Sequence, residues 1–206
     1  MNSVIINNKH IHPSKVVCIG RNYVAHIKEL NNEIPSEPVI FMKPNSAISG
    51  KIIINDTDEI HYEGEISLMV NEGKLSAVGF GLDLTKRQVQ SQLKAKGLPW
   101  ERAKSFDGSA VFSEFVEFNG KTENLKIELW INGKLKQSGG CDLMLYKPDQ
   151  ILNEINSFST LQNGDIIMTG TPDGVGVINQ SDEFIGKIYN KDQLLVERKW
   201  TIKKLN

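Results

Sequence analysis

The stretch EIHYEGEISLMV, residues 59–70, alternates apolar and polar side chains as a β-strand does. The apolar side chains share one face, which requires a core: Tyr62, Ile66, Leu68 and Val70. The opposite face carries the polar side chains: His61, Glu63, Glu65 and Ser67. Carboxylates on a strand are most often solvated, and neighbouring ones repel each other unless a positive charge lies between them. The strand alone leaves a solvated face and a cation-binding face both open.

The composition is that of an ordinary globular domain. The chain has 206 residues, 39% of them hydrophobic, which is enough for one domain with a sizeable core. Its net charge of −1 gives no reason to expect a nucleic-acid partner or an anionic membrane. No run approaches the roughly 18 apolar residues of a membrane span, and the start lacks the apolar region of a secretory signal. Because Cys18 and Cys141 have neither metal nor redox spacing, we expect a cytoplasmic protein.

Short strand-like runs dominate the remainder of the chain, and few segments favour helices. Asn132 and Gly133 between two alternating runs predict a two-residue hairpin turn, and residues 189–193 predict a looser one. The helical segments are residues 22–31, 85–97 and 148–158. We therefore predict a β-rich α+β domain, a sandwich or rolled sheet with a few covering helices.

A third carboxylate follows an apolar run. Asp83 in GFGLDLT lies where a strand gives way to the helix predicted at 85–97. Thr85 and Gln88 fit a capping box, so Asp83 is free for another role, although a spare capping acid is the alternative. Three carboxylates with no cysteine nearby would form a hard-oxygen site that favours Mg²⁺, Mn²⁺ or Ca²⁺ over zinc. His61 could support a ligand or simply lie on the surface.

Several motifs resemble, in the same order, those of the fumarylacetoacetate hydrolase family: CIGRNYVAHIKEL (18–30), EPVIFMKPNSAI (37–48), HYEGEISLMV (61–70), GFGLDLTKRQVQ (79–90), GLPWERAKSFD (97–107) and GDIIMTGTPDGVG (164–176). On this resemblance we predict a short N-terminal segment at 1–14 and a catalytic domain at 15–206. The chain is similar to the short, single-domain branch, which contains acylpyruvate hydrolases, oxaloacetate decarboxylases and enol–keto tautomerases. The resemblance implies a mixed β-sandwich roll of the family's C-terminal-domain type, usually a homodimer.

The resemblance also implies the ligands of a metal ion. The family holds its metal with a Glu-x-Glu motif and a downstream Asp, which correspond to Glu63, Glu65 and Asp83. This agrees with the carboxylate cluster and implies Mg²⁺ or Mn²⁺ as the cofactor. Gly64, between the two glutamates, is a departure to which the sequence assigns no role.

His26 and Glu29 lie three residues apart and share a face if their segment is helical. A carboxylate bonded to an imidazole orients it and makes it a better base toward water, although a surface pair is the commoner arrangement. The resemblance implies that this pair is the water-activating dyad of the family's hydrolases. It also implies that Lys104, otherwise a solvated lysine, stabilises the negative charge that develops on the substrate.

The resemblance assigns further residues to the substrate pocket. Arg87 and Gln90, three apart on the predicted helix, border the pocket. The loop with Gly170 and Thr171 can aim backbone N–H groups and a hydroxyl at a substrate carboxylate, unless it is only a tight turn. Arg21 matches a position at the pocket edge.

Together these residues predict chemistry on a small 2-oxo acid. We predict that an acylpyruvate-type 2,4-dioxo acid is cleaved to pyruvate and a carboxylic acid, with a divalent cation as the electron sink and His26 and Glu29 activating water. Oxaloacetate decarboxylation and enol–keto tautomerisation use the same electron sink and are the alternatives. A catalytically silent metal-binding subunit is the alternative of another class. We expect neither nucleic acid nor membrane as a partner.

Overall fold

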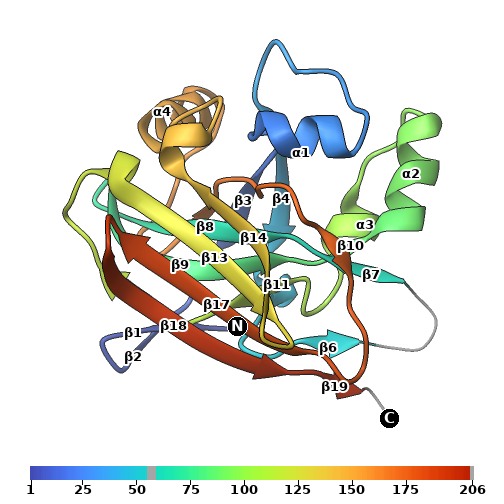
Figure 1. The fold of residues 1–206 in the computed structure, drawn as a ribbon. Coiled ribbons are helices and arrows are strands. Elements are labelled where there is room, and N and C mark those ends of the chain that lie inside the picture. The colour runs from blue at the N-terminus through green and yellow to red at the C-terminus, as the bar shows by residue number, and fades with distance from the viewer. Residues whose placement is uncertain (55–58, 205–206) are drawn as a thin grey trace.

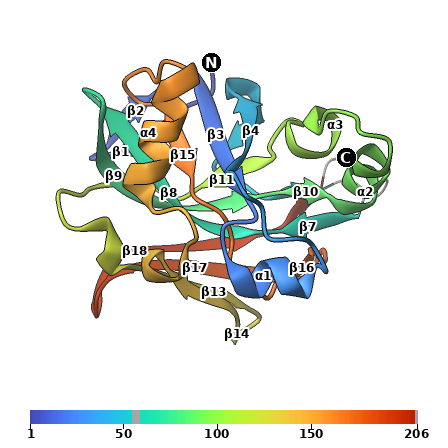
Figure 2. The same ribbon diagram turned by 90° about the horizontal axis from the view of Figure 1, so that it is seen from above.

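A computed structural model describes residues 1–54 and 59–204, so residues 55–58 and 205–206 of the domain predicted at 15–206 lie outside the described residues. Two β-sheets form the body of the protein, and four helices and several smaller strand pairs surround them (Figures 1 and 2). The prediction of a β-rich fold with a few covering helices is confirmed.

The larger sheet has eight strands, seven of them in the order β4-β3-β15-β8-β9-β11-β5, with β12 paired to β9. Its strands are β3 (Lys15–Gly20), β4 (Val39–Pro44), β5 (Ile48–Ser49), β8 (Gly64–Asn71), β9 (Lys74–Asp83), β11 (Ala110–Phe112), β12 (Val116–Glu117) and β15 (Ile166–Met168). Strand β15 pairs parallel with β3 and antiparallel with β8, so the sheet is mixed. The sheet curls: Lys43 of β4 contacts Asp83 of β9, although three strands lie between β4 and β9 in the sheet order.

The second sheet has four antiparallel strands in the order β14-β13-β17-β18. They are β13 (Leu125–Ile131), β14 (Lys134–Gly140), β17 (Glu183–Asn190) and β18 (Gln193–Thr201). Asn132 and Gly133 join β13 to β14 with φ angles of 51° and 73°, which are the left-handed values of a tight hairpin turn. Both predicted hairpins are confirmed, because β17 and β18 also pair across a short turn.

Smaller strand pairs complete the fold. A three-stranded sheet contains β7 (Ile60–Tyr62), β10 (Thr85–Lys86) and β16 (Gly176–Val177). Two further pairs are β1 (Val4–Ile6) with β2 (Lys9–Ile11), and β6 (Ile53–Ile54) with β19 (Lys203–Lys204). The segment predicted at 1–14 is not detached, since Val4 is buried in a core and the N–H of Phe115 donates to the carbonyl of Ile5.

The main hydrophobic core lies between the two sheets. Phe80 of β9 packs against Trp200 of β18, with ring centroids 5.8 Å apart. Gly186 of β17 allows this close approach, because a Cβ there would lie 2.6 Å from the ring of Phe80. Burial of this apolar surface is the principal force that holds the sheets together.

Two further cores lie on the larger sheet. Its concave side encloses apolar side chains such as Val16, Met69 and Phe112. On the other side, Ile151 and Ile155 of helix α4 (Pro148–Phe158) pack over β3 and β15. The remaining helices are α1 (Val24–Glu29), α2 (Arg87–Ala95) and α3 (Glu101–Lys104), with single 3₁₀ turns at Asn45–Ala47, Thr122–Asn124 and Cys141–Leu143. Within the described residues, no helix combines the length and apolar character needed to cross a membrane.

Two local expectations differ from the structure. The stretch 59–70 is not one strand: β7 ends at Tyr62, β8 begins at Gly64, and the two belong to different sheets. The capping box at Thr85 is wrong, because Thr85 lies in β10, the N-cap of α2 is Lys86, and no side chain caps this helix. The hydroxyl of Thr85 is used in the site instead, as a buried partner of Lys104.

Candidate metal centre and active site

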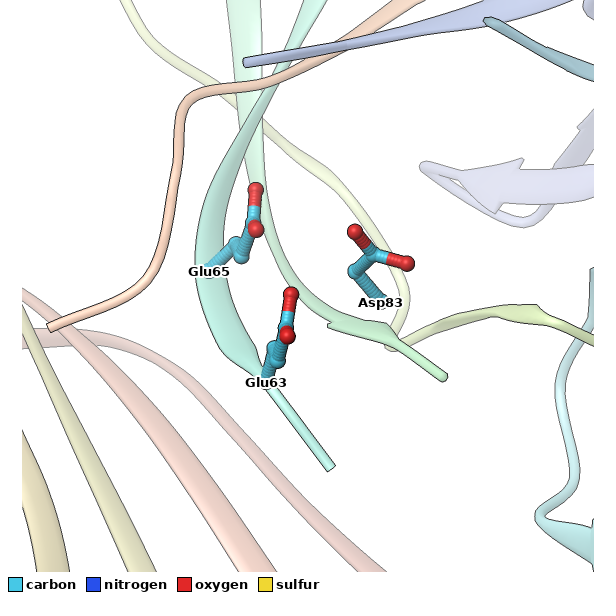
Figure 3. A group of neighbouring side chains, drawn as sticks. All are labelled: Glu63, Glu65 and Asp83. Atoms are coloured by element: carbon cyan, nitrogen blue, oxygen red, sulfur yellow. The ribbon is translucent and has the colours of Figure 1, made fainter. Parts of the chain in front are cut away.

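Glu63 lies at the break between β7 and β8, just before a strand in which every residue except Asn71 is buried. In the ladder, Gly64 pairs with Leu82 and Glu65 with Gly81, and the N–H of Asp83 donates to the carbonyl of Glu63. This register sets Asp83 beside the two glutamates, and Figure 3 shows the three carboxylates directed toward one another. One carboxylate oxygen from each residue lies within 4.8 Å of the other two and all three residues are buried, so a solvated polar face is excluded.

Three cationic side chains form ion pairs with this triad and offset its negative charge. Lys104 Nζ lies 2.8 Å from Glu63 Oε2 and 2.7 Å from Asp83 Oδ2. Lys43 Nζ lies 2.8 Å from Asp83 Oδ1 and also donates to the carbonyl of Lys104. Arg87 pairs with the other oxygen of Glu63. Glu65 differs, since within the described residues it makes no ion pair and its Oε2 accepts only the N–H of Gly170.

These contacts shift the pKa values of the two glutamates in opposite directions. Burial raises the pKa of Glu63, but the charges of Lys104 and Arg87 outweigh it and hold that pKa well below its ordinary value. Burial also raises the pKa of Glu65, and repulsion from Asp83 and Glu63 raises it further. Burial lowers the pKa of Lys104, but Asp83 and Glu63 outweigh it and the net shift is upward. The triad therefore has one carboxylate that lacks a compensating cation.

The residues present fit a divalent cation. The donor set consists of carboxylate oxygens alone, which Mg²⁺ and Mn²⁺ prefer. Glu65 has no cationic partner, and Asp83 Oδ1 accepts no hydrogen bond among the described residues although Lys43 lies near it. Both features are expected of groups arranged for a cation. Lys104 would share Glu63 and Asp83 with such an ion, because its ammonium group bridges them.

Beside the triad lies a small cavity of about 40 Å³, enough for roughly three water molecules. Predicted site residues from five separate segments line it: Arg21, His26, Glu63, Glu65, Arg87, Gln90, Lys104 and Thr171. His26 Nδ1 lies 3.2 Å from Glu29 Oε2, and Glu29 Oε1 accepts the N–H of Gly174 at 3.0 Å. With Nδ1 used by Glu29, Nε2 is the ring nitrogen of His26 that remains for the cavity. The predicted pairing of His26 and Glu29 is thus present in the structure.

Helix α2 carries both of its predicted site residues, Arg87 and Gln90, at the cavity. Gln90 is the buried residue of α2, whereas Val89 and Leu93 are only half-buried. Arg87 donates to Gln90 Oε1 at 2.8 Å and also pairs with Glu63. Arg87 and Gln90 therefore act together at the cavity wall, where their predicted substrate contacts stay predictions.

Three predicted substrate-binding donors are already used within the protein. The three N–H groups of Lys104 point to Glu63, Asp83 and Thr85. The hydroxyl of Thr171 donates to the carbonyl of Gly64 at 2.9 Å, and the N–H of Gly170 donates to Glu65. In this arrangement the charge of Lys104, rather than a free donor, faces the cavity, and the loop at 170–171 is hydrogen-bonded to the strand that carries the candidate metal ligand Glu65.

Sequence reasoning missed two buried residues of the site. The first is Lys43, which is fully buried on β4. The available signal in the sequence was the alternating pattern of this strand, which places Lys43 on one of its faces just before Pro44. Gln137 of β14 accepts the N–H of Gly64 and donates to Thr171 Oγ1 and the carbonyl of Pro172, each at 2.8 Å. Gly64 therefore has a structural role, because a Cβ at this position would lie 3.0 Å from Gln137 Oε1.

Comparison with known proteins identifies the family. The sequence model of the fumarylacetoacetate hydrolase C-terminal domain matches residues 15–198. The chain belongs to this family. It is 38% identical over 188 residues to the oxaloacetate tautomerase of Escherichia coli strain K12, covering 82% of this chain and 86% of the relative. It is 37% identical over 182 residues to a mitochondrial oxaloacetate decarboxylase of Dictyostelium discoideum, covering 80% and 84%.

A solved structure of the family agrees over nearly the whole chain. Fumarylpyruvate hydrolase from Pseudomonas aeruginosa, in complex with Mn²⁺ and pyruvate, superposes with a TM-score of 0.90 at 25% identity. The match covers 99% of this chain and 96% of that one. As a member of the fumarylacetoacetate hydrolase family with relatives of this kind, the protein is an enzyme with an acidic triad that could bind a metal ion.

Proposed function

We propose that the protein is a divalent-metal-dependent oxaloacetate tautomerase, which interconverts the enol and keto forms of this four-carbon 2-oxo acid. The observation that carries the proposal is the 38% identity to an oxaloacetate tautomerase over 82% of the chain. The site supports it, because a buried acidic triad and a histidine held by a carboxylate line one small cavity. These findings favour the tautomerase or decarboxylase alternative over the acylpyruvate cleavage expected from the sequence.

Glu63, Glu65 and Asp83 would hold Mg²⁺ or Mn²⁺. Such a cation, when bound, supplies a Lewis acid that draws electrons from the 2-oxo group. Lys104 adds a fixed positive charge on the same side of the cavity, and Arg87 holds Glu63 in place. The protein's own contribution is a rigid, largely buried set of charges that needs little rearrangement during the reaction.

Tautomerisation moves one proton, and His26 is placed for that transfer. From enol to keto, a proton leaves the C2 hydroxyl and a proton is added at C3. His26 Nε2 can take up and return a proton at the cavity, while Glu29 fixes the tautomer through Nδ1 and is itself held by the N–H of Gly174. The same base would activate water in a hydrolase, so the presence of the pair does not by itself select hydrolysis.

A second candidate is cleavage of a 2,4-dioxo acid such as fumarylpyruvate. The likeness to the Pseudomonas fumarylpyruvate hydrolase, with its TM-score of 0.90, favours it. Decarboxylation of oxaloacetate is the third outcome of the same electron withdrawal and needs no water. The homodimer, the cytoplasmic location and the cofactor's identity as Mg²⁺ stay predictions.

The decisive experiment follows the decay of enol oxaloacetate by ultraviolet absorbance, with Mg²⁺ or Mn²⁺ and with EDTA. We expect metal-dependent acceleration without pyruvate formation, which lactate dehydrogenase and NADH would report in the same cuvette. Pyruvate from oxaloacetate would favour the decarboxylase, and pyruvate from fumarylpyruvate alone would favour the hydrolase. A protein that binds Mn²⁺ but turns over none of these acids would be the silent subunit.

The role of His26 is tested by His26→Asn. We expect kcat for tautomerisation to fall by at least about 100-fold, since a positioned acid–base group contributes that much. His10→Asn is the matched control, because His10 lies exposed on β2 and does not line the cavity. Unchanged kcat in His26→Asn would remove this residue from the proton transfer.

A further inference from the structure

The cavity carries more positive charge than the triad requires. Glu63, Glu65 and Asp83 contribute at most three negative charges, and Lys43, Lys104 and Arg87 contribute three positive ones. Two further cations, Arg21 and Lys94, line the same cavity. Among the described residues neither makes an ion pair, so the wall has two unmatched positive charges even before any metal is counted.

Lys94 is held in place by neutral groups alone. Its Nζ donates to Asn32 Oδ1 at 3.2 Å and lies 5.7 Å from the centroid of the Trp100 ring. Asn32 is itself fixed, because its backbone N–H donates to the carbonyl of Ile27 in α1. A lysine ammonium has three donors, and Asn32 uses one of them. Two donors of Lys94 therefore remain for a ligand.

The surroundings of Lys94 favour an anion beside it. Burial lowers the pKa of Lys94, and the positive charges of Arg21 and Arg87 lower it further. A bound carboxylate would relieve both effects, since it neutralises the cluster of cations and replaces lost solvent. The cavity holds only about three water molecules, so a four-carbon acid would need a long wall side chain to change rotamer. Arg21 makes no ion pair among the described residues and can do so without breaking one, while Lys94 keeps its contact with Asn32.

We propose that Lys94 is the specificity-determining residue that binds the distal carboxylate of a dianionic 2-oxo acid, while the 2-oxo end faces the acidic triad. This rests on the proposed function and deepens it, because it makes the second carboxylate of the substrate a requirement. Lys94 lies on α2 and its partner Asn32 follows α1, so their hydrogen bond joins these two elements beside the cavity.

The test compares Lys94→Met with the wild type on oxaloacetate and on its C4 methyl ester, which lacks the distal charge. We expect kcat/KM for oxaloacetate to fall by about 10- to 100-fold, the usual loss for a hydrogen bond to a charged group. The loss falls mainly on KM, because the distal carboxylate is not the reacting centre. The ester is used equally by both proteins, and Lys94→Arg restores most of the activity on oxaloacetate. Lys96→Met is the control, since Lys96 is exposed just beyond the same helix.

Calorimetric binding of the same two compounds to the Mn²⁺-supplemented protein gives a readout that does not depend on turnover. If the wild type fails to tautomerise oxaloacetate but still prefers the dianion through Lys94, the proposed function is wrong and the charge selection stands. If Lys94→Met weakens oxaloacetate and its ester equally, or lowers kcat alone, Lys94 does not read the distal carboxylate and the inference is overturned.

Discussion

Replacing Lys43 by methionine removes the most deeply buried charge of the site while keeping a side chain of similar length. Lys43 is fully buried, and its ammonium contacts Asp83 at 2.8 Å and the carbonyls of Leu84 and Lys104. Breaking a buried ion pair by deleting one partner costs about 3–5 kcal/mol, because the other charge stays buried and unpaired. Asp83 retains Lys104 at 2.7 Å, so we expect the lower end, about 3 kcal/mol.

For a domain of 206 residues this loss lowers the melting temperature by about 6–12 °C. The measurement is urea and thermal unfolding in EDTA, so that no metal ion contributes. The control is Lys199→Met, because Lys199 lies 2.6 Å from Glu183 in an ion pair whose side chains are 57% and 42% exposed. An exposed pair contributes at most about 1 kcal/mol. Equal losses in the two variants would refute the argument that burial, rather than distance, sets the energy.

Two further perturbations test the triad and its support. Because the folded-state pKa of Glu65 is raised above the ordinary 4.5, the folded protein binds more protons than the unfolded one above that pH. The stability of the metal-free wild type should therefore fall as pH rises from 4.5 through the raised pKa. In Glu65→Gln, urea midpoints measured in EDTA should lose this part of the decline, and Mn²⁺ should no longer raise the melting temperature. A Mn²⁺ response equal to that of the wild type would contradict the assignment of Glu65 as a ligand. Gln137→Leu leaves the N–H of Gly64 without its acceptor and should cost about 2–3 kcal/mol in urea unfolding, whereas Gln162→Leu, at an exposed position, should change stability by less than about 0.5 kcal/mol. Equal effects of the two substitutions would mean that the hydrogen bond from β14 does not support the strand that carries the candidate metal ligands.

Much of the site could be predicted because it depends on local spacing. Glu65 lies on β8 and Glu63 just before it, and their spacing of two residues along extended backbone is enough to bring the two carboxylates together. His26 and Glu29 lie three apart on a short helix, and the structure has them 3.2 Å apart. The capping box predicted at Thr85 was wrong because a contact distant in the chain replaced the local one. The local pattern was present, but the hydroxyl of Thr85 pairs with Lys104.

Periodicity and left-handed turn residues act over a few positions of the chain. The sequence could therefore predict the order of the strand-like runs, the two hairpin turns and the acidic triad with its candidate base. The tertiary structure alone decided how the charges are paired. Lys43 reaches Asp83 because the larger sheet curls until β4 faces β9, and Gln137 reaches Gly64 because the second sheet packs on β8. Such contacts join residues far apart in the chain, and burial of the apolar cores, not local propensity, brings them together.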